Sequence, residues 1–467
     1  MNQLALLSAV AACALAAAAA SPVLAQQAPK PPKPLMRDFI GINAHTVQFK
    51  PELYAPICRL VRDYHPFDWD IDGSTAKQRP FPIAQHIDWN DESGRFRSRH
   101  APVNWHELYA SWQKAGFEID ACVQFGNGAT PEKWTNIDAD AYRYGKAFAE
   151  YFGPSGANKL VTSVEIGNEP AGSKEFQKDD YAGYKRIFTA MARGVRDGDP
   201  KLTILTATAE APRDGKTDGW SLPLALFEDS GVLYDVINIH KYALIRGWPT
   251  FERVNPEDPK LDYKGVLQPS IDWRDKHAPG KEVWITEFGF DASTKQPDPK
   301  GQWKDWKDST DLEQAQWIVR SFLFFSELDL ARAYLYWFND NDTPSFHASS
   351  GVTRFLEPKP SYWAMGHLYR SLGDYRFSRT VEKTDGRAWV FEYVHETDPS
   401  QLVWVAWSPT RGGQEATQTL NLPGKVVNAE RMPTAGNENV AVTLEPEADG
   451  SAEVKLTESP LYVWLKR

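Results

Sequence analysis

Cysteine is scarce in this sequence of 467 residues, which contains only three. Cys13 lies in an apolar N-terminal stretch, so Cys58 and Cys122 alone belong to the rest of the chain. Two cysteines cannot build a disulfide scaffold, and we expect two buried thiols rather than one bridge, because cysteine is among the most buried residue types. Because His-Glu-x-x-His and Cys-x-x-Cys spacings are absent, we expect no structural or catalytic metal and no other cofactor.

Basic residues are fewer than acidic ones. The chain has 52 Lys and Arg against 62 Asp and Glu, a formal net charge of −10. This balance argues against nucleic acid or an anionic membrane as the main partner, since both need basic surfaces. The run "GRFRSRH", residues 94–100, is a local exception. It indicates a solvated loop, and contact with carboxylated or sulfated sugars is the alternative.

Residues 1–25 form an apolar stretch that ends in the small-x-small pattern "VLA". The stretch is typical of a secretory signal, although it lacks the usual early Lys or Arg. "VAAC", residues 10–13, resembles a lipoprotein cleavage box, which is the second interpretation. The Pro-rich residues 26–37 then form an extended leader. We expect a secreted or periplasmic protein, and 42% hydrophobic with 24% charged residues favour a globular chain without a membrane-spanning segment.

Aromatic side chains are abundant, with 18 Trp, 18 Tyr and 23 Phe. This number exceeds what a core of this size needs. For any single Trp, core filling is the commoner role, but flat rings exposed in a cleft suit stacking on sugar faces or bases.

From residue 39 onward, short apolar runs alternate with longer segments of helical spacing, which predicts a parallel sheet with helical crossovers. Eight such units in residues 38–374 fit a (β/α)₈ barrel, whose chemistry lies at the C-terminal strand ends. A doubly wound open sheet is the alternative, but no Gly-rich phosphate turn follows the first strand. The predicted strands are "FIGINA", "ICRLVRDY", "FEIDACVQF", "LVTSVEIGNE", "KLTILTATA", "DVINIHKY", "EVWITEFGF" and "ARAYLYWF".

After a last helix that ends near Tyr375, the spacing changes to strict alternation. Period-two runs separated by turn residues predict antiparallel strands, so residues 375–467 are expected to form a small β-sandwich. Its aromatic residues could bind sugar, but packing between the sheets is the favoured use. The predicted strands are "AWVFEYVHE", "QLVWVAWS", "TQTLNLP", "AEVKLTES" and "LYVWLKR".

The stretch "TSVEIGNEPAGS", residues 162–173, follows an apolar strand with two carboxylates, Glu165 and Glu169. A buried acid is costly unless it is paired, and such costs are tolerated where strand ends face a cleft. Glu287, in "VWITEFGFDAS", ends the predicted seventh strand. Glu169 and Glu287 should therefore face each other across the barrel mouth, as retaining glycosidases require of two carboxyls about 5 to 5.5 Å apart. We expect Glu165 to point into the barrel and to be held by an arginine, in a structural role.

Asn168-Glu169-Pro170, combined with the Trp-Ile-Thr-Glu-Phe-Gly strand of Glu287, resembles the clan A glycoside hydrolases over residues 39–375. Each motif alone is a weak signal, whereas the two on the fourth and seventh strands are specific. The resemblance implies that Glu169 is the acid/base, that Glu287 is the nucleophile and that Asn168 binds the 2-hydroxyl of the sugar. It also implies a retaining β-glycosidase or endo-β-glycanase that acts on an oligo- or polysaccharide without a cofactor.

Other positions resemble the clan less specifically. His240 and Tyr242 end the sixth strand, where clan members have a similar tyrosine bonded to the nucleophile, which would hold Glu287 ionised. Arg62 resembles the arginine of the second strand and is expected near the nucleophile, because a buried arginine needs a carboxylate. Trp337, on the eighth strand, resembles the ring at the floor of the sugar subsite. Four residues at other strand ends are further candidates for binding hydroxyls: His45, Trp69, Gln124 and Asn127.

The sequence departs from the commonest clan pattern at Gly167, where a bulkier residue is frequent, and at Ala171, where Asn is frequent. The Gly-Asn-Glu form resembles the arabinofuranosidase and heparanase-like branches, whereas the rest is closer to the xylosidase and endoglucanase branches. Tryptophan-rich loops, residues 243–263 and 292–308, are expected to decide the sugar. Two other functions compete: a non-catalytic carbohydrate-binding protein on the same barrel, and an esterase, for which no Gly-x-Ser-x-Gly turn is present.

Overall fold

The computed structural model describes residues 32–44, 50–67, 70–72, 77–78, 83–90, 96–125, 134 and 136–467. The expected signal, residues 1–25, and three candidate residues, His45, Trp69 and Asn127, lie outside the described residues. Within the described part of the chain, no helix combines the length and the apolar character needed to cross a membrane.

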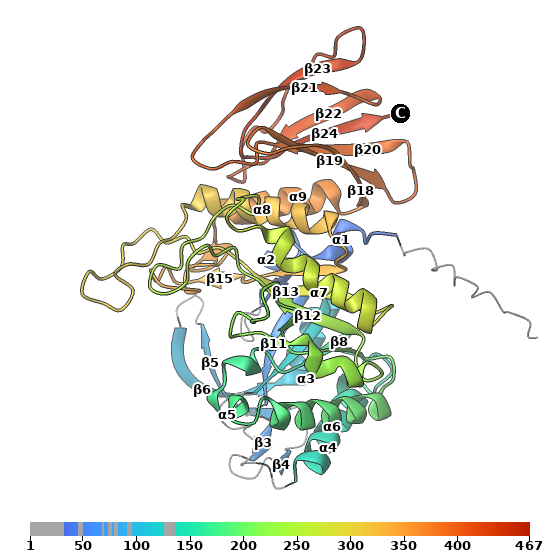
Figure 1. The fold of residues 1–467 in the computed structure, drawn as a ribbon, viewed down its shortest axis with the longest axis vertical. Coiled ribbons are helices and arrows are strands. Elements are labelled where there is room, and N and C mark those ends of the chain that lie inside the picture. The colour runs from blue at the N-terminus through green and yellow to red at the C-terminus, as the bar shows by residue number, and fades with distance from the viewer. Residues whose placement is uncertain are drawn as a thin grey trace, which may run out of the picture. The chain divides into compact units, whose positions relative to one another are not determined.

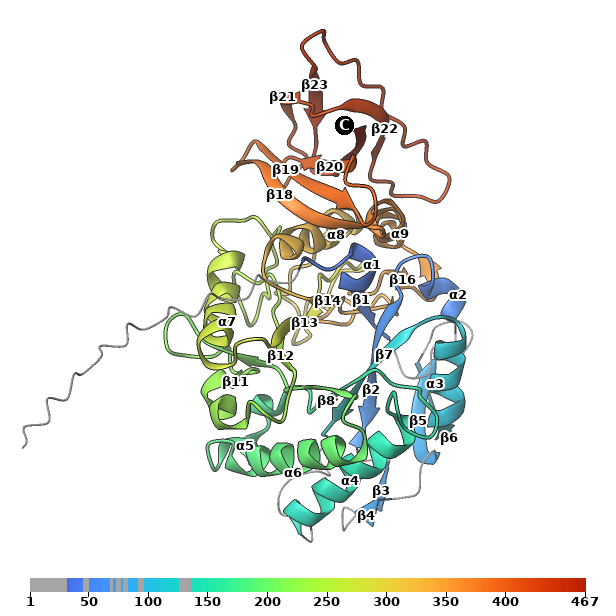
Figure 2. The same cartoon turned by 90° about the vertical axis from the view of Figure 1, so that its right-hand side faces the viewer.

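Eight parallel strands close into a barrel in the order β1-β14-β13-β12-β9-β8-β7-β2 (Figures 1 and 2). They come from the eight runs that the sequence predicts, so the (β/α)₈ barrel is confirmed. The runs are recognisable because a parallel sheet covered by helices is buried on both faces and needs nearly continuous apolar sequence. The strands are β1 (Ile40–Asn43), β2 (Leu60–Pro66), β7 (Glu118–Gln124), β8 (Ser163–Ile166), β9 (Thr203–Leu205), β12 (Val236–His240), β13 (Glu282–Phe288) and β14 (Arg332–Leu335).

Helices lie outside the barrel, and side chains fix where several of them begin. Asn104 accepts hydrogen bonds from the first turn of α3 (Trp105–Lys114), and Thr310 forms a capping box with Glu313 at the start of α8 (Asp311–Glu327). Two connections lack the expected long helix, since β1 is followed by α2 (Pro51–Tyr54) and β9 by the 3₁₀ helix η4 (Leu224–Ser230). The long helices are α3 (Trp105–Lys114), α4 (Ile137–Phe152), α6 (Ala182–Gly198), α7 (Tyr263–His277), α8 (Asp311–Glu327) and α9 (Pro360–Leu372).

An antiparallel hairpin, β5 (Ile83–Asn90) and β6 (Phe96–Asn104), is inserted between β2 and α3. The solvated loop predicted for residues 94–100 is therefore wrong from Phe96 onward. The arginine-rich run lacks the apolar alternation that marks a strand, and it is the pairing with β5 that satisfies its backbone. Shorter elements are α1 (Met36–Phe39), β3 (Ile71–Asp72), β4 (Lys77–Gln78), η3 (Pro170–Gly172), α5 (Lys174–Gln177), β10 (Ala209–Glu210), β11 (Leu222–Pro223), β15 (Asn339–Asp340), β16 (Thr353–Arg354) and β17 (Glu357–Pro358).

The C-terminal strands form a five-stranded antiparallel sheet, β18-β19-β20-β24-β22, and a two-stranded sheet, β21-β23. This arrangement confirms the all-β domain, and β18 and β22 are strands that the sequence analysis did not identify. A separate apolar core lies between the sheets. The strands are β18 (Tyr375–Thr384), β19 (Ala388–His395), β20 (Gln401–Trp407), β21 (Ala416–Asn421), β22 (Lys425–Arg431), β23 (Ser451–Leu456) and β24 (Leu461–Lys466).

The larger sheet packs against α8 and α9 (Figures 1 and 2). Trp404 belongs to the core between the sheets, as expected. Trp389 and Trp407 do not, because they join the core shared with the barrel helices, where Trp389 stacks on Phe324 at 5.8 Å between ring centroids. A small sheet next to a large barrel can bury aromatic residues on both of its faces, so the expectation of packing between the sheets was wrong for these two residues.

Candidate active site

Glu169 and Glu287 meet at the C-terminal end of the barrel. Glu169 directly precedes η3, after β8, and Glu287 lies near the end of β13. One carboxylate oxygen of each and one ring nitrogen of His240, at the end of β12, all lie within 4.8 Å of one another. The fourth, sixth and seventh strands of the barrel therefore bring these three side chains to one point.

Gly167 makes the turn that delivers Glu169. Its backbone has φ +92°, in the region that only glycine adopts readily, and an added Cβ would lie 3.1 Å from the ring of Tyr184 and 3.3 Å from that of Phe125. The glycine that departs from the commonest clan pattern is thus required by this chain's own backbone.

Arg62, on β2, joins the carboxylates at the base of the site. The side chain is fully buried, and Nε and Nη2 donate to both oxygens of Glu165 at 2.7 and 2.9 Å. Nη1 donates to Glu287 Oε1 at 2.8 Å and to Asn43 Oδ1 at 2.7 Å. The arginine expected to hold Glu165 and the one expected near Glu287 are therefore the same residue.

Asn168 is also in contact with Arg62, whose Nη2 donates to the Asn168 Oδ1 at 2.7 Å. Because the amide oxygen accepts this bond, the amide NH₂ is the group that Asn168 can offer to a ligand. A donor in that position suits a sugar hydroxyl.

Glu287 is 5% exposed, and charge and hydrogen bonds hold it ionised. Burial alone would raise its pKa, but the nearby His240 and Arg62 and the hydrogen bonds from Tyr64 and Tyr242 lower the pKa to about 2. The Tyr64 hydroxyl donates to Oε1 at 2.7 Å, and the Tyr242 hydroxyl donates to Oε2 at 2.8 Å. The bond from Tyr242 is the one that the sequence led us to expect.

His240 links the two acids. Its Nδ1 is 2.9 Å from Glu169 Oε1 and 3.6 Å from Glu287 Oε2. Its Nε2 is 3.0 Å from the hydroxyl of Thr286, which donates its own proton to Asn238. Nε2 therefore donates to Thr286, and Nδ1 forms a hydrogen bond with Glu169. Burial lowers the pKa of His240, but Glu287 and Glu169 outweigh it and raise the pKa.

Tyr242 is itself held in place by a buried ion pair. The Arg253 guanidinium lies 5.3 Å from the centroid of the Tyr242 ring, and it pairs with Asp291 at 2.5 Å. Arg253 also donates to the carbonyl of Gly289 at 2.7 Å. This clamp fixes the phenol that bonds Glu287, and the sequence contained no local signal for it.

Two other predicted residues lie at the same end of the barrel. Trp337 follows β14, is 8% exposed and stacks on Tyr336 at 5.4 Å between centroids. The Tyr336 ring in turn lies 6.4 Å from that of Tyr242. Gln124 is the last residue of β7 and is half-buried. Roles for both in binding sugar stay predictions.

Sequence reasoning missed Tyr64, Asn43 and Thr286. A signal existed for Tyr64, because it lies two residues after Arg62 on the same strand and alternate residues share a face. Asn43 ends β1, a position where polar residues in a barrel are candidates for the site.

Glu169, His240 and Glu287 could also be considered as metal ligands, given their proximity. The fit is poor, because both ring nitrogens of His240 have hydrogen-bond partners. Arg62 already provides the positive charge beside Glu287 at 2.8 Å. A divalent cation would have to displace these contacts.

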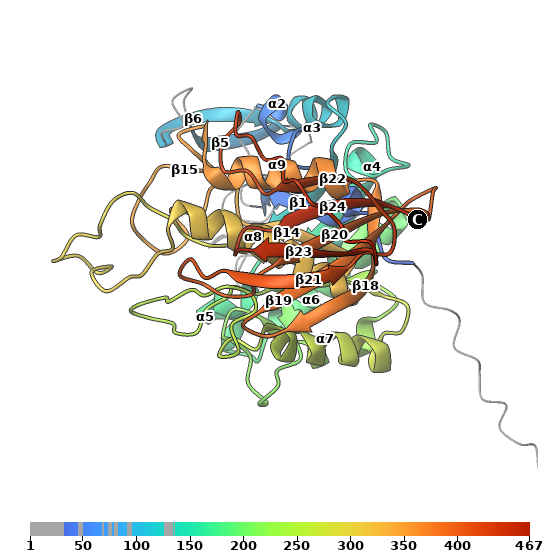
Figure 3. The same cartoon turned by 90° about the horizontal axis from the view of Figure 1, so that it is seen from above.

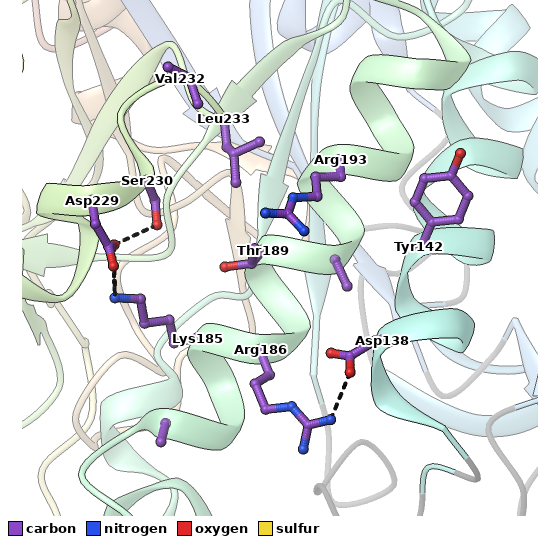
Figure 4. Close-up of a pocket in the computed structure, with 12 residues that line it drawn as sticks. Asp138, Tyr142, Lys185, Arg186, Thr189, Arg193, Asp229, Ser230, Val232 and Leu233 are labelled. Atoms are coloured by element: carbon purple, nitrogen blue, oxygen red, sulfur yellow. Dashed lines mark hydrogen bonds and ion pairs between the residues drawn. The ribbon is translucent and has the colours of Figure 1, made fainter.

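A separate cavity of about 660 Å³ lies on the outer surface, between α4, α6 and the segment around Asp229 (Figure 4). Neither Glu169 nor Glu287 lines it. Two of the three cations that line it pair with acids, Lys185 with Asp229 at 2.8 Å and Arg186 with Asp138 at 2.9 Å. Its lining residues make the cavity distinct from the strand-end site.

No protein-family model and no curated protein matches this sequence. Solved structures do match it. A family 39 glycoside hydrolase from Bacteroides cellulosilyticus superposes with a TM-score of 0.63 at 17% identity, covering 93% of this chain and 81% of the other. A family 51 arabinofuranosidase from Xanthomonas axonopodis gives 0.61 at 15% identity, with 93% and 98% covered. A family 30 xylanase from Clostridium acetobutylicum gives 0.53 at 13% identity, with 93% and 97% covered.

The chain has the fold of the clan A glycoside hydrolases. In a barrel of this kind, catalytic residues come from the C-terminal ends of several strands. The side chains of Glu169, His240 and Glu287 converge at that end.

Proposed function

We propose that this protein is a secreted retaining glycoside hydrolase that cleaves β-linked glycans, with Glu287 as nucleophile and Glu169 as acid/base. One observation carries the proposal: an oxygen of Glu169 lies within 4.8 Å of an oxygen of Glu287. Retaining glycosidases place their carboxyls about 5 to 5.5 Å apart, whereas inverting enzymes need about 6.5 to 9.5 Å to admit a water molecule.

The two carboxylates have environments that suit different roles. Glu287 is buried, bonded to Arg62 and two phenols, and ionised, as an attacking group must be. Glu169 is 26% exposed and lies 2.9 Å from Nδ1 of His240. An acid/base has to give a proton to the leaving group and later take one from water, so partial exposure and a hydrogen-bonded histidine favour Glu169 for this task.

The reaction follows from these roles. Glu287 attacks the anomeric carbon while Glu169 protonates the departing glycosidic oxygen, which leaves a glycosyl ester on Glu287. Water then enters, Glu169 removes its proton, and the resulting attack on the same carbon releases Glu287. Asn168 is placed to donate to a hydroxyl of the bound sugar. The similar structures include a xylanase and an arabinofuranosidase, and these activities support O-glycoside hydrolysis.

A non-catalytic sugar-binding protein on the same fold is the competing function. It would have no need for an ionised Glu287 held by Arg62, Tyr64 and Tyr242, because removing a carboxylate from water is costly unless the charge is used. Secretion rests on residues 1–25.

A screen of aryl glycosides and plant polysaccharides, with analysis of the products, tests the proposal. We expect E169Q and E287Q each to lower turnover by several orders of magnitude while the fold survives. E118Q is the matched control, because Glu118 begins β7 at the opposite end of the barrel. Near-normal turnover in E169Q or E287Q would refute the assignment, and a wild-type protein that binds sugars without cleaving any would favour the competing function.

A further inference from the structure

A row of rings starts at the candidate nucleophile. Tyr242, whose hydroxyl donates to Glu287, lies 4.4 Å from the ring of His347. His347 lies 3.7 Å from Phe346, which stacks on Phe251 at 4.0 Å with 18° between the ring planes. The row therefore leaves the site through the loops after β12 and β14.

The row ends at the surface. Trp303 lies 5.7 Å from Phe251 and 5.6 Å from Trp248, measured between ring centroids. Trp248 is 62% exposed, and Trp303 is half-buried. The loops after β12 and β13 that carry these rings project on the same side of the barrel, at the left in Figures 1 and 3. The outer end of the row thus presents indole surface to solvent.

A backbone hydrogen bond joins the loop after β12 to the loop after β13. The Lys307 amide donates to the carbonyl of Thr250 at 2.8 Å. Arg253 packs on the inner end of the row, 5.2 Å from the centroid of Phe346. The two loops are therefore joined before any ligand arrives, which lowers the entropy cost of binding between them.

Packing does not explain Trp248. An indole can bury about 150 to 250 Å², so leaving most of it in water forgoes substantial hydrophobic stabilisation. Trp306, on the same loop as Trp303, is 5% exposed and already fills the interior of that region. Two residues of the row, Phe251 at φ +43° and His347 at φ +65°, adopt left-handed backbone, a strained conformation that is tolerated mostly at functional sites.

We propose that Trp248 and Trp303 bind a further sugar residue of the same glycan, beyond the one held at Glu169 and Glu287. The substrate is then a chain of several sugars rather than a simple aryl glycoside or disaccharide. This inference rests on the proposed function, because it takes the glycan to be bound at the two acids. The apolar C–H face of a pyranose or furanose fits a flat indole.

Trp248 and Trp303 together are called the platform. Polar groups border it, which suits a ligand with hydroxyls around an apolar face. Arg246 and Lys307 both approach the Glu252 carboxylate, at 3.7 and 3.6 Å, and both are more than half exposed. They can donate to hydroxyls at the edge of a stacked sugar. The continuity of the rings with Tyr242 places the platform along one path out of the site.

Calorimetry with xylotetraose, cellotetraose and arabinotetraose tests the platform. Binding of the tetraoses is measured in proteins that also carry E169Q, because turnover is expected to stop there. Turnover of para-nitrophenyl xyloside, glucoside and arabinofuranoside is measured in proteins that keep Glu169. W248A and W303A should weaken the binding of at least one tetraose by about tenfold or more. Turnover of the aryl glycosides should stay within about twofold, because they do not reach the platform.

W248F keeps a flat ring and should restore part of the affinity. W273A is the matched control, since Trp273 stacks on His277 on the outside of the barrel, in α7. Unchanged tetraose affinity in both W248A and W303A would overturn the inference, as would a wild-type protein that hydrolyses aryl glycosides but binds none of the tetraoses. Tetraose binding that depends on Trp248 in a protein without hydrolytic activity would support the platform and refute the proposed function instead.

Discussion

Arg62 and Glu287 form an ion pair of 2.8 Å in which neither side chain is more than 6% exposed. The same guanidinium holds Glu165, which is also fully buried. One cation thus compensates two carboxylates in the centre of the barrel. Burial raises the pKa of Glu165 to about 7 despite the opposing effect of Arg62, which indicates how much the desolvation costs.

Replacing Arg62 should therefore damage both stability and activity. In R62M the two carboxylates lose their cation, and we expect a loss of about 3 to 5 kcal/mol in the free energy of unfolding. R62K keeps the charge but cannot reproduce the forked geometry, so turnover should fall by about 100-fold even where the fold survives. Urea unfolding and steady-state kinetics measure the two effects.

Arg59 provides the control for this experiment. It lies on the same chain segment and pairs with Glu118, but its side chain is 39% exposed. Exposed pairs contribute little, so R59M should change stability by less than about 1 kcal/mol and leave turnover intact. Equal effects of R59M and R62M would show that the buried network has no special importance.

The pH dependence of kcat/KM should show how the hydrogen bonds from Tyr64 and Tyr242 lower the pKa of Glu287. With its pKa at about 2, Glu287 stays ionised over the whole working range. Y242F removes a hydrogen bond to the charged form, so the pKa of Glu287 rises and the acidic limb of the profile should move up by about one pH unit or more. Profiles of wild type, Y64F and Y242F that extend down to about pH 2 measure the shift. Superimposable acidic limbs would contradict this account of Glu287.

The same shift sets the sign of a stability effect. The folded pKa of Glu287, about 2, lies below the value of about 4.3 expected for an unfolded chain. Its contribution to stability is therefore fully present above about pH 4.3 and is lost as the pH falls toward 2. In Y242F the folded pKa of Glu287 is higher, so its contribution to stability above about pH 4.3 should be smaller and its loss should be complete at a higher pH. Urea unfolding at a series of pH values, followed by circular dichroism, measures the difference.

Much of this fold could be predicted from the sequence because each barrel strand carries its own signal. Buried runs such as "VWI", residues 283–285, are apolar, and the helices begin at capping residues such as Asn104 and Thr310. The strands that escaped prediction lack such a pattern. β18 and β22 are largely half-buried or exposed and carry many charges, and β6 is rich in arginine.

The two acids could also be predicted, since each has a local motif at a strand end. The groups that control them could not, because their roles arise from contacts between distant segments. Arg253 and Asp291 are 38 residues apart, and the row from Tyr242 to Trp248 draws rings from three loops. Periodicity reports which face of an element a side chain occupies, but not which loops meet above the barrel.

Trp337 offers a test of binding against packing. If its ring forms the floor of the sugar site, W337A should raise KM by an amount equivalent to about 1 to 3 kcal/mol, because the sugar loses its apolar contact. The ring is also 8% exposed and stacked on Tyr336, so some loss of melting temperature is expected. W337F, which keeps an aromatic ring, serves as the comparison. Unchanged kinetics with a large drop in melting temperature would assign Trp337 to packing.

Azide rescue separates the roles of Glu169 and Glu287, which the glutamine variants cannot do. A retaining enzyme inverts the anomeric carbon twice, once when the nucleophile attacks and again when water displaces it. In E287A, azide can enter the vacated space and attack the substrate directly. Only one inversion then occurs, so the glycosyl azide should have the anomeric configuration opposite to that of the substrate.

In E169A the nucleophile is intact, and an aryl glycoside with a good leaving group needs no protonation to form the ester on Glu287. Azide, which needs no general base, then carries out the second inversion, so the glycosyl azide should have the same anomeric configuration as the substrate. Proton NMR of the two products measures this difference directly. The opposite pairing of variant and product would exchange the roles of the two acids. Absence of rescue in both variants, in a wild-type protein that turns over the same aryl glycoside, would refute double displacement through Glu287, because the vacated site borders Arg62 and Tyr64, whose hydrogen bonds favour an anion.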